Sequence, residues 1–255
     1  MSDSPTHPHA LEENHSQDVV ISEQALQKAE EFIEAEEGAS NKLKGWLGVL
    51  VTTLAVVMSV FHLYTAYAIV PTQTLRPMHV GFVLVLCFLM FPIASKYRHR
   101  IMWWDWLAAL LSIAVVVYLI WGGDDFTDRN TLPEFWDVVL GIALIVMVME
   151  AMRRTNGWIM PIITGCFILY ALYGPLLPAP WTHKGYAVGR LVGVMYMTLE
   201  GIYGVAVDVS SSLIILFTIF GAFLQYSGAG KFYIDFSFSA MGGKRSEERR
   251  VGKEC

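Results

Sequence analysis

Three aspartates, Asp124, Asp125 and Asp128, lie close together in the segment GGDDFTDR at residues 122–129. Closely spaced carboxylates bind Ca²⁺ when a full set of oxygen ligands converges on the ion. The segment lacks the EF-hand spacing and the distal glutamate that would complete such a set. The spacing therefore favours a solvated turn, with a contact to a soluble partner as the second interpretation.

Two histidines, His62 and His79, are the next candidates, because each is expected near the same end of a separate apolar helix. Two histidines at a common depth can ligate haem from both faces. Histidines in such positions are more often hydrogen-bonded or in contact with water. We favour the hydrogen-bonded interpretation, and the visible absorption spectrum of the purified chain tests the haem alternative.

A hydrolytic site needs a nucleophile with its base, or two facing carboxylates. The sequence identifies no buried histidine partner for the serines at residues 210–212, and Asp105 is expected to reach water at the start of an apolar helix. Glu150 precedes Arg154 by four residues, which is the spacing of a favourable ion pair on one helix face. We predict no enzymatic activity, no bound cofactor and no metal site.

The composition excludes a water-soluble globular protein. Hydrophobic residues make up 55% of the 255 residues and charged residues only 16%, against roughly 25% charged in an ordinary soluble domain. The net charge is −5, and no stripe of Lys and Arg with interleaved aromatics occurs, so no nucleic-acid partner is expected. Residues 1–41 hold the acidic excess and are predicted to form a polar segment with one amphipathic helix at about residues 22–38.

Beyond residue 41 the chain consists of long charge-poor runs, and about 20 apolar residues cross a bilayer as a helix. Six spans are predicted, at residues 46–68, 77–95, 106–123, 135–152, 155–173 and 209–230. Residues 191–207 are predicted to form a short helix at the membrane interface. Asp137 and Glu150 lie near the ends of the fourth span, where they are expected to reach water. The predicted fold class is all-α, a polytopic membrane protein with about six transmembrane helices.

The distribution of Lys and Arg between the spans predicts the orientation. Four basic residues fall on one side, namely Arg76, Arg129, Lys184 and Arg190. Nine fall on the other side, namely Lys42, Lys44, Lys96, Arg98, Arg100, Arg153, Arg154, Lys231 and Lys244. The side with nine is predicted to be cytoplasmic, as is the N-terminus, and Lys96, Arg98, Arg100, Arg153 and Arg154 are the predicted topology anchors.

The last eleven residues, RSEERRVGKEC at 245–255, form a charged stub without apolar periodicity. They resemble, residue for residue, the translation of a widely used sequencing-library adapter. Segments of foreign origin carry no information on the fold. We therefore expect residues 245–255 to be an artefact and the natural chain to continue beyond Lys244.

The segment EAMRRTNGWIMPIITGCFILYALYGPLLP at residues 150–178 resembles the fused membrane permease of tripartite ATP-independent periplasmic (TRAP) transporters, in the branch that works with TAXI-type binding proteins. Shorter segments resemble the same family: YTA at 64–66, RPMH at 76–79, EGIYG at 200–204, FGAFL at 220–224 and SGAG at 227–230. The resemblance covers about residues 41–243. It implies that a small membrane subunit, residues 42–190 with five helices, is fused to the start of a large subunit, residues 191–244.

The resemblance implies ion-driven uptake, usually sodium-coupled, of carboxylate-bearing solutes that a periplasmic solute-binding protein delivers to a permease in the bacterial inner membrane. The remaining large permease region and membrane lipid are the other expected partners. From charge and location alone, we predict that the binding protein contacts Asp124, Asp125, Arg129, Lys184 and Arg190. The hairpins that hold substrate in such permeases would lie beyond residue 244, so no substrate residue is assigned. The alternative function is a stand-alone structural or partner-binding membrane subunit without transport activity.

Overall fold

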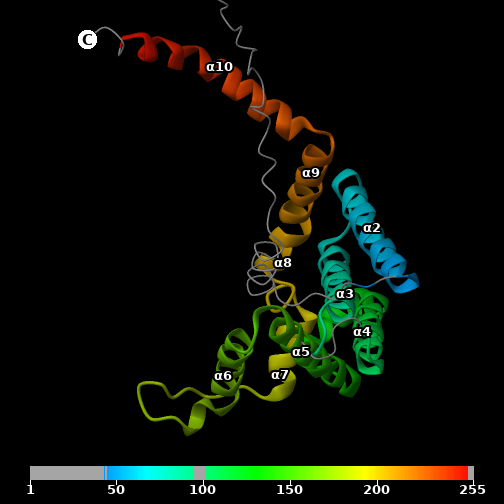
Figure 1. The fold of residues 1–255 in the computed structure, drawn as a ribbon. Helices are drawn as coiled ribbons and strands as arrows, with labels where there is room; N and C mark the ends of the chain where they lie inside the picture. Colours follow the sequence, from blue (N-terminus) through cyan, green and yellow to red (C-terminus); the bar gives the residue numbers. More distant parts are fainter. Residues whose placement is uncertain (1–42, 44, 95–100, 252–255) are drawn as a thin grey trace, which may run out of the picture. The chain divides into compact units, whose positions relative to one another are not determined.

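A computed structural model describes residue 43 and residues 45–94 and 101–251, and for residues 242–251 the helical backbone only. All regular structure in these residues is helical, without a strand (Figure 1). Six helical segments are long and apolar enough to cross a membrane. This result confirms the predicted all-α polytopic fold class. The predicted amphipathic helix at residues 22–38 lies outside the described residues.

The first three spans are α2 (Trp46–Tyr67), α3 (Thr72–Met90) and α4 (Trp103–Asp128). Helix α3 begins five residues before the predicted start, because Pro77 is accommodated inside the helix instead of opening it. Helix α4 continues past the predicted end at residue 123, with a break at Gly123, where φ is 53° and ψ is −137°. Glycine adopts this conformation without the steric cost that a side chain adds. The acidic segment is thus a short helical turn after a kink.

The remaining spans are α5 (Phe135–Asn156), α6 (Ile159–Tyr173) and a composite helix at residues 205–226. The composite span consists of α8 (Val205–Val209), a π-helical turn over Ser210–Ile214, and α9 (Ile215–Tyr226). It begins four residues before the predicted start and therefore includes Asp208. Short 3-10 turns follow α4 (η2, Arg129–Thr131) and α6 (η3, Gly174–Leu176), and α10 covers Ala229–Val251.

The short helix predicted at residues 191–207 is shorter and begins earlier in the structure. Residues Val188–Met197 form α7, which packs among the other helices, with Val192 and Tyr196 at most 1% exposed. The hydroxyl of Tyr196 donates to the backbone carbonyl of Val115, midway along α4, at 2.8 Å. Gly141 of α5 makes this packing feasible, because a side chain there would collide with Val192 and Tyr196. Small residues allow membrane helices to approach closely in this way.

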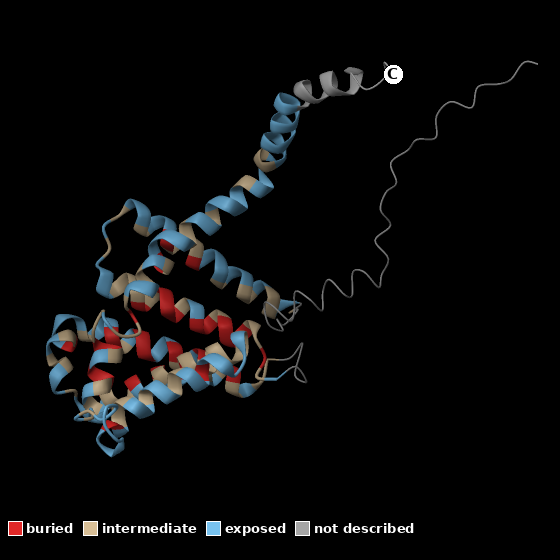
Figure 2. Cartoon of the chain, turned by 90° about the vertical axis from the view of Figure 1, so that its left-hand side faces the viewer, coloured by how far each residue is buried: buried red, intermediate tan, exposed pale blue. Residues whose placement is uncertain are grey.

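Buried residues gather in one group of helices, whereas α10 is exposed from residue 231 to residue 241 (Figure 2). The largest buried cluster contains Phe88, Val115, Leu144 and Tyr196, one from each of α3, α4, α5 and α7. Only 11% of the apolar window in α2 and in α6 is buried, and 6% in the last span. Apolar surface of this extent needs lipid or another apolar protein surface.

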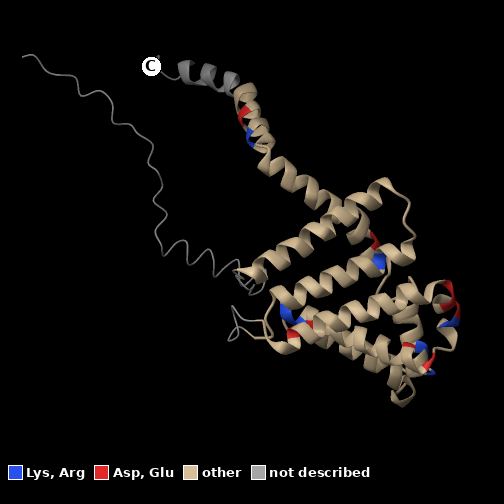
Figure 3. Ribbon diagram, turned by 90° about the vertical axis from the view of Figure 1, so that its right-hand side faces the viewer, with Lys and Arg blue, Asp and Glu red and all other residues tan. Residues whose placement is uncertain are grey.

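Charged residues lie at the helix ends and leave the middle of the helices uncharged (Figure 3). The start of α2 meets the start of α4, where the Trp46 and Trp106 rings stack at 6.3 Å. The end of α3 meets the end of α5 through Arg154. These contacts fit spans that alternate in direction. Following the predicted orientation, we call the end with the starts of α2 and α4 the inner end, and the end with their C-termini the outer end.

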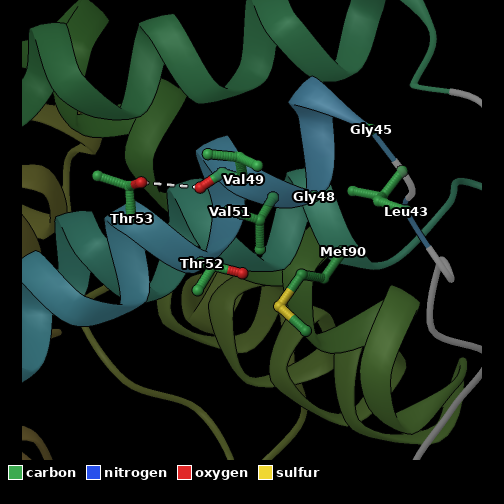
Figure 4. Close-up of a pocket in the computed structure, with 8 residues that line it drawn as sticks. All are labelled: Leu43, Gly45, Gly48, Val49, Val51, Thr52, Thr53 and Met90. Atoms are coloured by element: carbon green, nitrogen blue, oxygen red, sulfur yellow. Dashed lines mark hydrogen bonds between the residues drawn. The ribbon is translucent and has the colours of Figure 1, made fainter.

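A shallow pocket of about 540 Å³ lies beside the start of α2 (Figure 4). Its lining consists of backbone, apolar side chains and two threonines. The Thr53 hydroxyl is already used, because it donates to the Val49 carbonyl at 2.8 Å. None of the residues that line this pocket is titratable, and it offers no reactive group.

Candidate functional site

Two acidic and two basic side chains form a cluster at the inner end. Arg154 donates to Asp105 of α4 at 2.6 Å and to Glu150 at 2.8 Å. Arg153 contacts the same Glu150 carboxylate at 2.7 Å. The prediction that Asp105 reaches water is wrong, since its side chain is 2% exposed and that of Arg154 is 3% exposed. The predicted pair of Glu150 and Arg154 is confirmed.

The two arginines of this inner cluster also donate hydrogen bonds to backbone carbonyls directly after α3. Arg154 donates to the Phe91 carbonyl and Arg153 to the Ile93 carbonyl, each at 3.0 Å. The Arg154 guanidinium lies 5.0 Å from the centre of the Phe88 ring. Burial of a charge is tolerated only when it is paired and hydrogen-bonded. The cluster therefore joins α3, α4 and α5. The other predicted topology anchors, Lys96, Arg98 and Arg100, lie outside the described residues.

A second ion pair lies at the outer end of α4 and α5. Asp137 is 0% exposed and receives hydrogen bonds from Arg129 at 2.8 Å and from the Tyr118 hydroxyl at 2.8 Å. The expectation that Asp137 reaches water is wrong. The Glu134 backbone amide also donates to Asp137, at 2.9 Å, which caps the start of α5. Arg129 thus orders the turn between the two helices.

The five residues predicted to contact a binding protein differ in exposure and in ion pairing. Asp124 and Asp125 are exposed on the turn that follows Gly123, and Lys184 and Arg190 are exposed before and within the start of α7. None of these four forms an ion pair within the described part of the chain. Arg129 differs, because Asp137 holds its guanidinium and its side chain is only 29% exposed. The contact to a binding protein stays a prediction for all five.

An ion pair that the sequence does not predict joins α3 to the last span. Arg76 contacts Asp208 at 2.9 Å and donates to the Tyr203 carbonyl at 3.0 Å. The Arg76 side chain is 13% exposed and that of Asp208 is 41% exposed. The partners are 132 residues apart, and no local pattern links them.

Burial raises the pKa of the Tyr203 phenol far above its usual value.

His62 and His79 lie against each other, with His79 Nδ1 and His62 Nε2 2.9 Å apart. The second nitrogen of His62 contacts the Met58 carbonyl at 2.7 Å, and that of His79 contacts the Ser210 hydroxyl at 3.1 Å. The expectation that Ser210 has no buried histidine partner is wrong, because His79 lies within hydrogen-bond distance of its hydroxyl. The hydrogen-bonded interpretation of the two histidines is confirmed, and all four ring nitrogens are used in it.

The order Ser210, His79, His62 resembles a nucleophile, a base and an orienting group. Acyl transfer also needs backbone donors aimed at the developing oxyanion. The Ser210 amide is not free for this role, because it donates to the Ala206 carbonyl within the helix. The arrangement can hold and pass a proton, but it lacks the donor that hydrolysis requires.

An apolar cavity of about 600 Å³ adjoins this chain of hydrogen bonds, between α3, α5 and the start of the last span. Cys87, Val148 and Ile202 contribute to its walls, and His79 and Ser210 supply polar groups. Such a cavity suits an apolar group. Within the described residues, no group of three or more His, Cys, Asp or Glu is placed to hold a metal ion.

The fold defines the class of protein. Six apolar helices, with buried ion pairs near both ends, make this a multi-pass membrane protein.

Residues 143–248 match the family model described as "Tripartite ATP-independent periplasmic transporter, DctM component". No curated protein and no solved structure matches the chain significantly. The matched family is one of transporters, not of enzymes. Together with the six spans, the match supports a membrane permease component of a TRAP transporter.

The match begins within α5 and includes α6, α7 and the last span. Its start lies before the predicted boundary between residues 190 and 191, and its end lies within the predicted adapter-derived segment 245–255. Both boundaries stay predictions.

Proposed function

We propose that this chain is a permease component of a binding-protein-dependent, ion-driven secondary transporter that takes up carboxylate solutes, with sodium as the coupling ion. The family match over residues 143–248 carries the proposal, because it includes the helices from α5 into α10. The proposed location is the bacterial inner membrane, with the N-terminus in the cytoplasm. Catalysis has no part in this function.

The proposed partners are a TAXI-type periplasmic binding protein, the remaining large permease region and membrane lipid. The exposed apolar surface of α6 and the last span supports the second and third partners. Asp124, Asp125, Lys184 and Arg190 are exposed where a soluble partner can reach them at the predicted outer end. Charges in such positions mainly raise the association rate.

We further propose a fusion of a small-subunit region at residues 42–190 with the start of a large subunit at residues 191–244. The bonds of Arg76 to Asp208 and of His79 to Ser210 then join the two regions. A stand-alone structural subunit is the alternative. The exposure of apolar residues such as Phe217 and Phe223, at 64% and 68%, fits lipid or further helices around the last span.

Resequencing of the source DNA across codons 243–245 is the first step of the test. The continuous reading frame is then expressed and reconstituted in vesicles with the TAXI-type binding protein that its own genome encodes. Radiolabelled succinate and glutamate are the probes, with glucose as the non-carboxylate control. We expect uptake of a carboxylate that requires both the binding protein and an inward sodium gradient. Uptake without either one contradicts the corresponding part of the proposal.

The 255-residue chain alone is the matched control, and we expect no uptake from it. A stop codon after residue 255 in the source DNA would favour the stand-alone subunit. Uptake by this chain alone would refute the placement of the substrate hairpins beyond residue 244.

The proposed docking surface is tested by reversing Asp124 and Asp125 to lysine. We expect slower association of the binding protein at low salt, and a smaller difference at about 1 M salt, where the Debye length is about 3 Å. Thr127→Ala, on the same turn, is the uncharged control. Equal association rates at low salt would remove these residues from the docking surface.

A further inference from the structure

The hydrogen bonds of His62, His79 and Ser210 have a defined direction. The Met58 carbonyl only accepts, so His62 Nδ1 must carry the proton of the 2.7 Å bond. A neutral imidazole has one donor and one acceptor, so His62 Nε2 accepts from His79 Nδ1 at 2.9 Å. His79 Nε2 then accepts, and the Ser210 hydroxyl donates to it at 3.1 Å. One carbonyl thus fixes the tautomers of both histidines.

The hydrogen-bonded groups of His62, His79 and Ser210 can take up one additional proton. A proton that binds His79 Nε2 makes an imidazolium that still donates to His62 Nε2 and now also donates to the Ser210 oxygen. The hydroxyl of Ser210 only has to turn toward a helix carbonyl. Ser212, in the same π-helical turn, already donates to the Asp208 carbonyl at 2.7 Å, which is the usual alternative for serine in a helix.

A second proton cannot be held in the same way. Both histidines would then be donors, and the bond between His79 Nδ1 and His62 Nε2 would be lost. His62 is 0% exposed and His79 is 5% exposed, so two adjacent imidazolium groups would be buried without a counter-charge. The hydrogen bonds therefore accommodate one proton, although burial disfavours even this single charge. A second proton would in addition break the bond between the two rings.

The surroundings of the pair are otherwise almost neutral. The charged groups from the packed elements are Arg76 of α3 and Asp208 of α8, which pair with each other at 2.9 Å. Tyr203 contributes its backbone carbonyl to Arg76, and Cys87 of α3 is a titratable side chain on the same cavity as His79. Helices α2 and α5 contribute apolar side chains, Thr155 and the Met58 carbonyl. A proton on His79 is thus the main change of charge available to this part of the protein.

We propose that His62, His79 and Ser210, beside the apolar cavity, form a one-proton binding site that links α2, α3 and the last span. Proton binding forms one N–H bond at His79 Nε2 and reverses one hydrogen bond. No covalent bond of the protein breaks. The site is independent of the solute and of the coupling ion, so its test does not depend on transport.

The test uses the full chain with ¹⁵N-labelled histidine in phosphatidylcholine vesicles, studied by solid-state NMR between about pH 8 and about pH 3. The range extends below that of an exposed histidine because burial favours the neutral imidazole. His62→Gln and His79→Gln assign the two sets of signals. We expect one imidazolium per pair, with the coupling between His79 Nδ1 and His62 Nε2 retained. The absence of protonation in this range, or two imidazolium groups that form together, would overturn the proposal.

Serine variants separate proton binding from simple packing. Ser210→Ala removes the acceptor of the added bond, and we expect a proton affinity about tenfold lower, a shift of about one pH unit in the midpoint. Ser210→Thr retains the hydroxyl and should restore the parent midpoint. His183→Gln, on the segment after η3, should leave it unchanged. Equal midpoints for Ser210→Ala and the parent protein would also overturn the proposal.

Discussion

Replacing Arg154 by glutamine removes the central member of the inner cluster. Arg154 donates to Asp105 at 2.6 Å, to Glu150 at 2.8 Å and to the Phe91 carbonyl at 3.0 Å. Glu150 keeps its contact with Arg153 at 2.7 Å. Asp105 keeps only the Met102 backbone amide at 3.0 Å among the bonds that the structure gives it. The variant therefore leaves one carboxylate buried without a counter-charge.

The expected loss is large because both side chains are almost completely buried, at 3% and 2% exposure. Breaking a buried ion pair by removing one partner costs about 3–5 kcal/mol. Asp105→Asn combined with Arg154→Gln removes both charges, so the double variant should lose less than the sum of the two single variants. A coupling free energy of about 2 kcal/mol is expected for groups in direct contact.

The free energy of unfolding is measured in mixed micelles by titration with sodium dodecyl sulfate, with tryptophan fluorescence as the signal. Lys184→Gln is the control, because this exposed residue forms no ion pair in the described residues and should change stability by less than about 0.5 kcal/mol. A loss below about 1 kcal/mol for Arg154→Gln, or additive single and double variants, would refute the inner cluster as a joint between α3, α4 and α5.

Three further predictions are checked by the same unfolding titration. Asp137→Asn should cost about 3 kcal/mol, since it removes the counter-charge of Arg129, and Tyr118→Phe only about 1 kcal/mol; equal losses would contradict the geometry. Gly141→Ala should destabilise by about 1–3 kcal/mol through overlap with α7, whereas Gly221→Ala, with open space around it, should be neutral or stabilising; the reverse order would argue against the position of α7. Tyr203→Phe should raise stability by up to about 1 kcal/mol, because the buried hydroxyl has no partner within the described residues. Burial raises the pKa of this phenol, so tyrosine ionises first in the unfolded protein and the free energy of unfolding falls as the pH rises above about 10. Tyr203→Phe should reduce this fall. An unchanged dependence of the unfolding free energy on pH would contradict the prediction.

The number and order of the spans could be predicted from the sequence. A membrane span needs about 20 apolar residues in a row, and the bilayer permits only structures that satisfy their own backbone hydrogen bonds. Both conditions depend on local sequence. The break after α6 at Gly174 and Pro175 is also a local signal, and the helix ends at Tyr173 as predicted. The pairing of His62 with His79 was accessible as well, because a short turn between two spans leaves few arrangements.

Only the tertiary structure decided which charges on different helices meet. Asp105 and Arg154 are 49 residues apart, and Arg76 and Asp208 are 132 residues apart. Charges near span ends reach water if nothing covers them, and the sequence does not show that neighbouring helices do. The same limit applies to the packing of α7, since an apolar helix of ten residues suits an interface and a packed core equally well. The sequence determined the spans of this protein because hydrophobic length is a property of each segment, whereas burial of a charge or of a short helix is a property of the packing between segments.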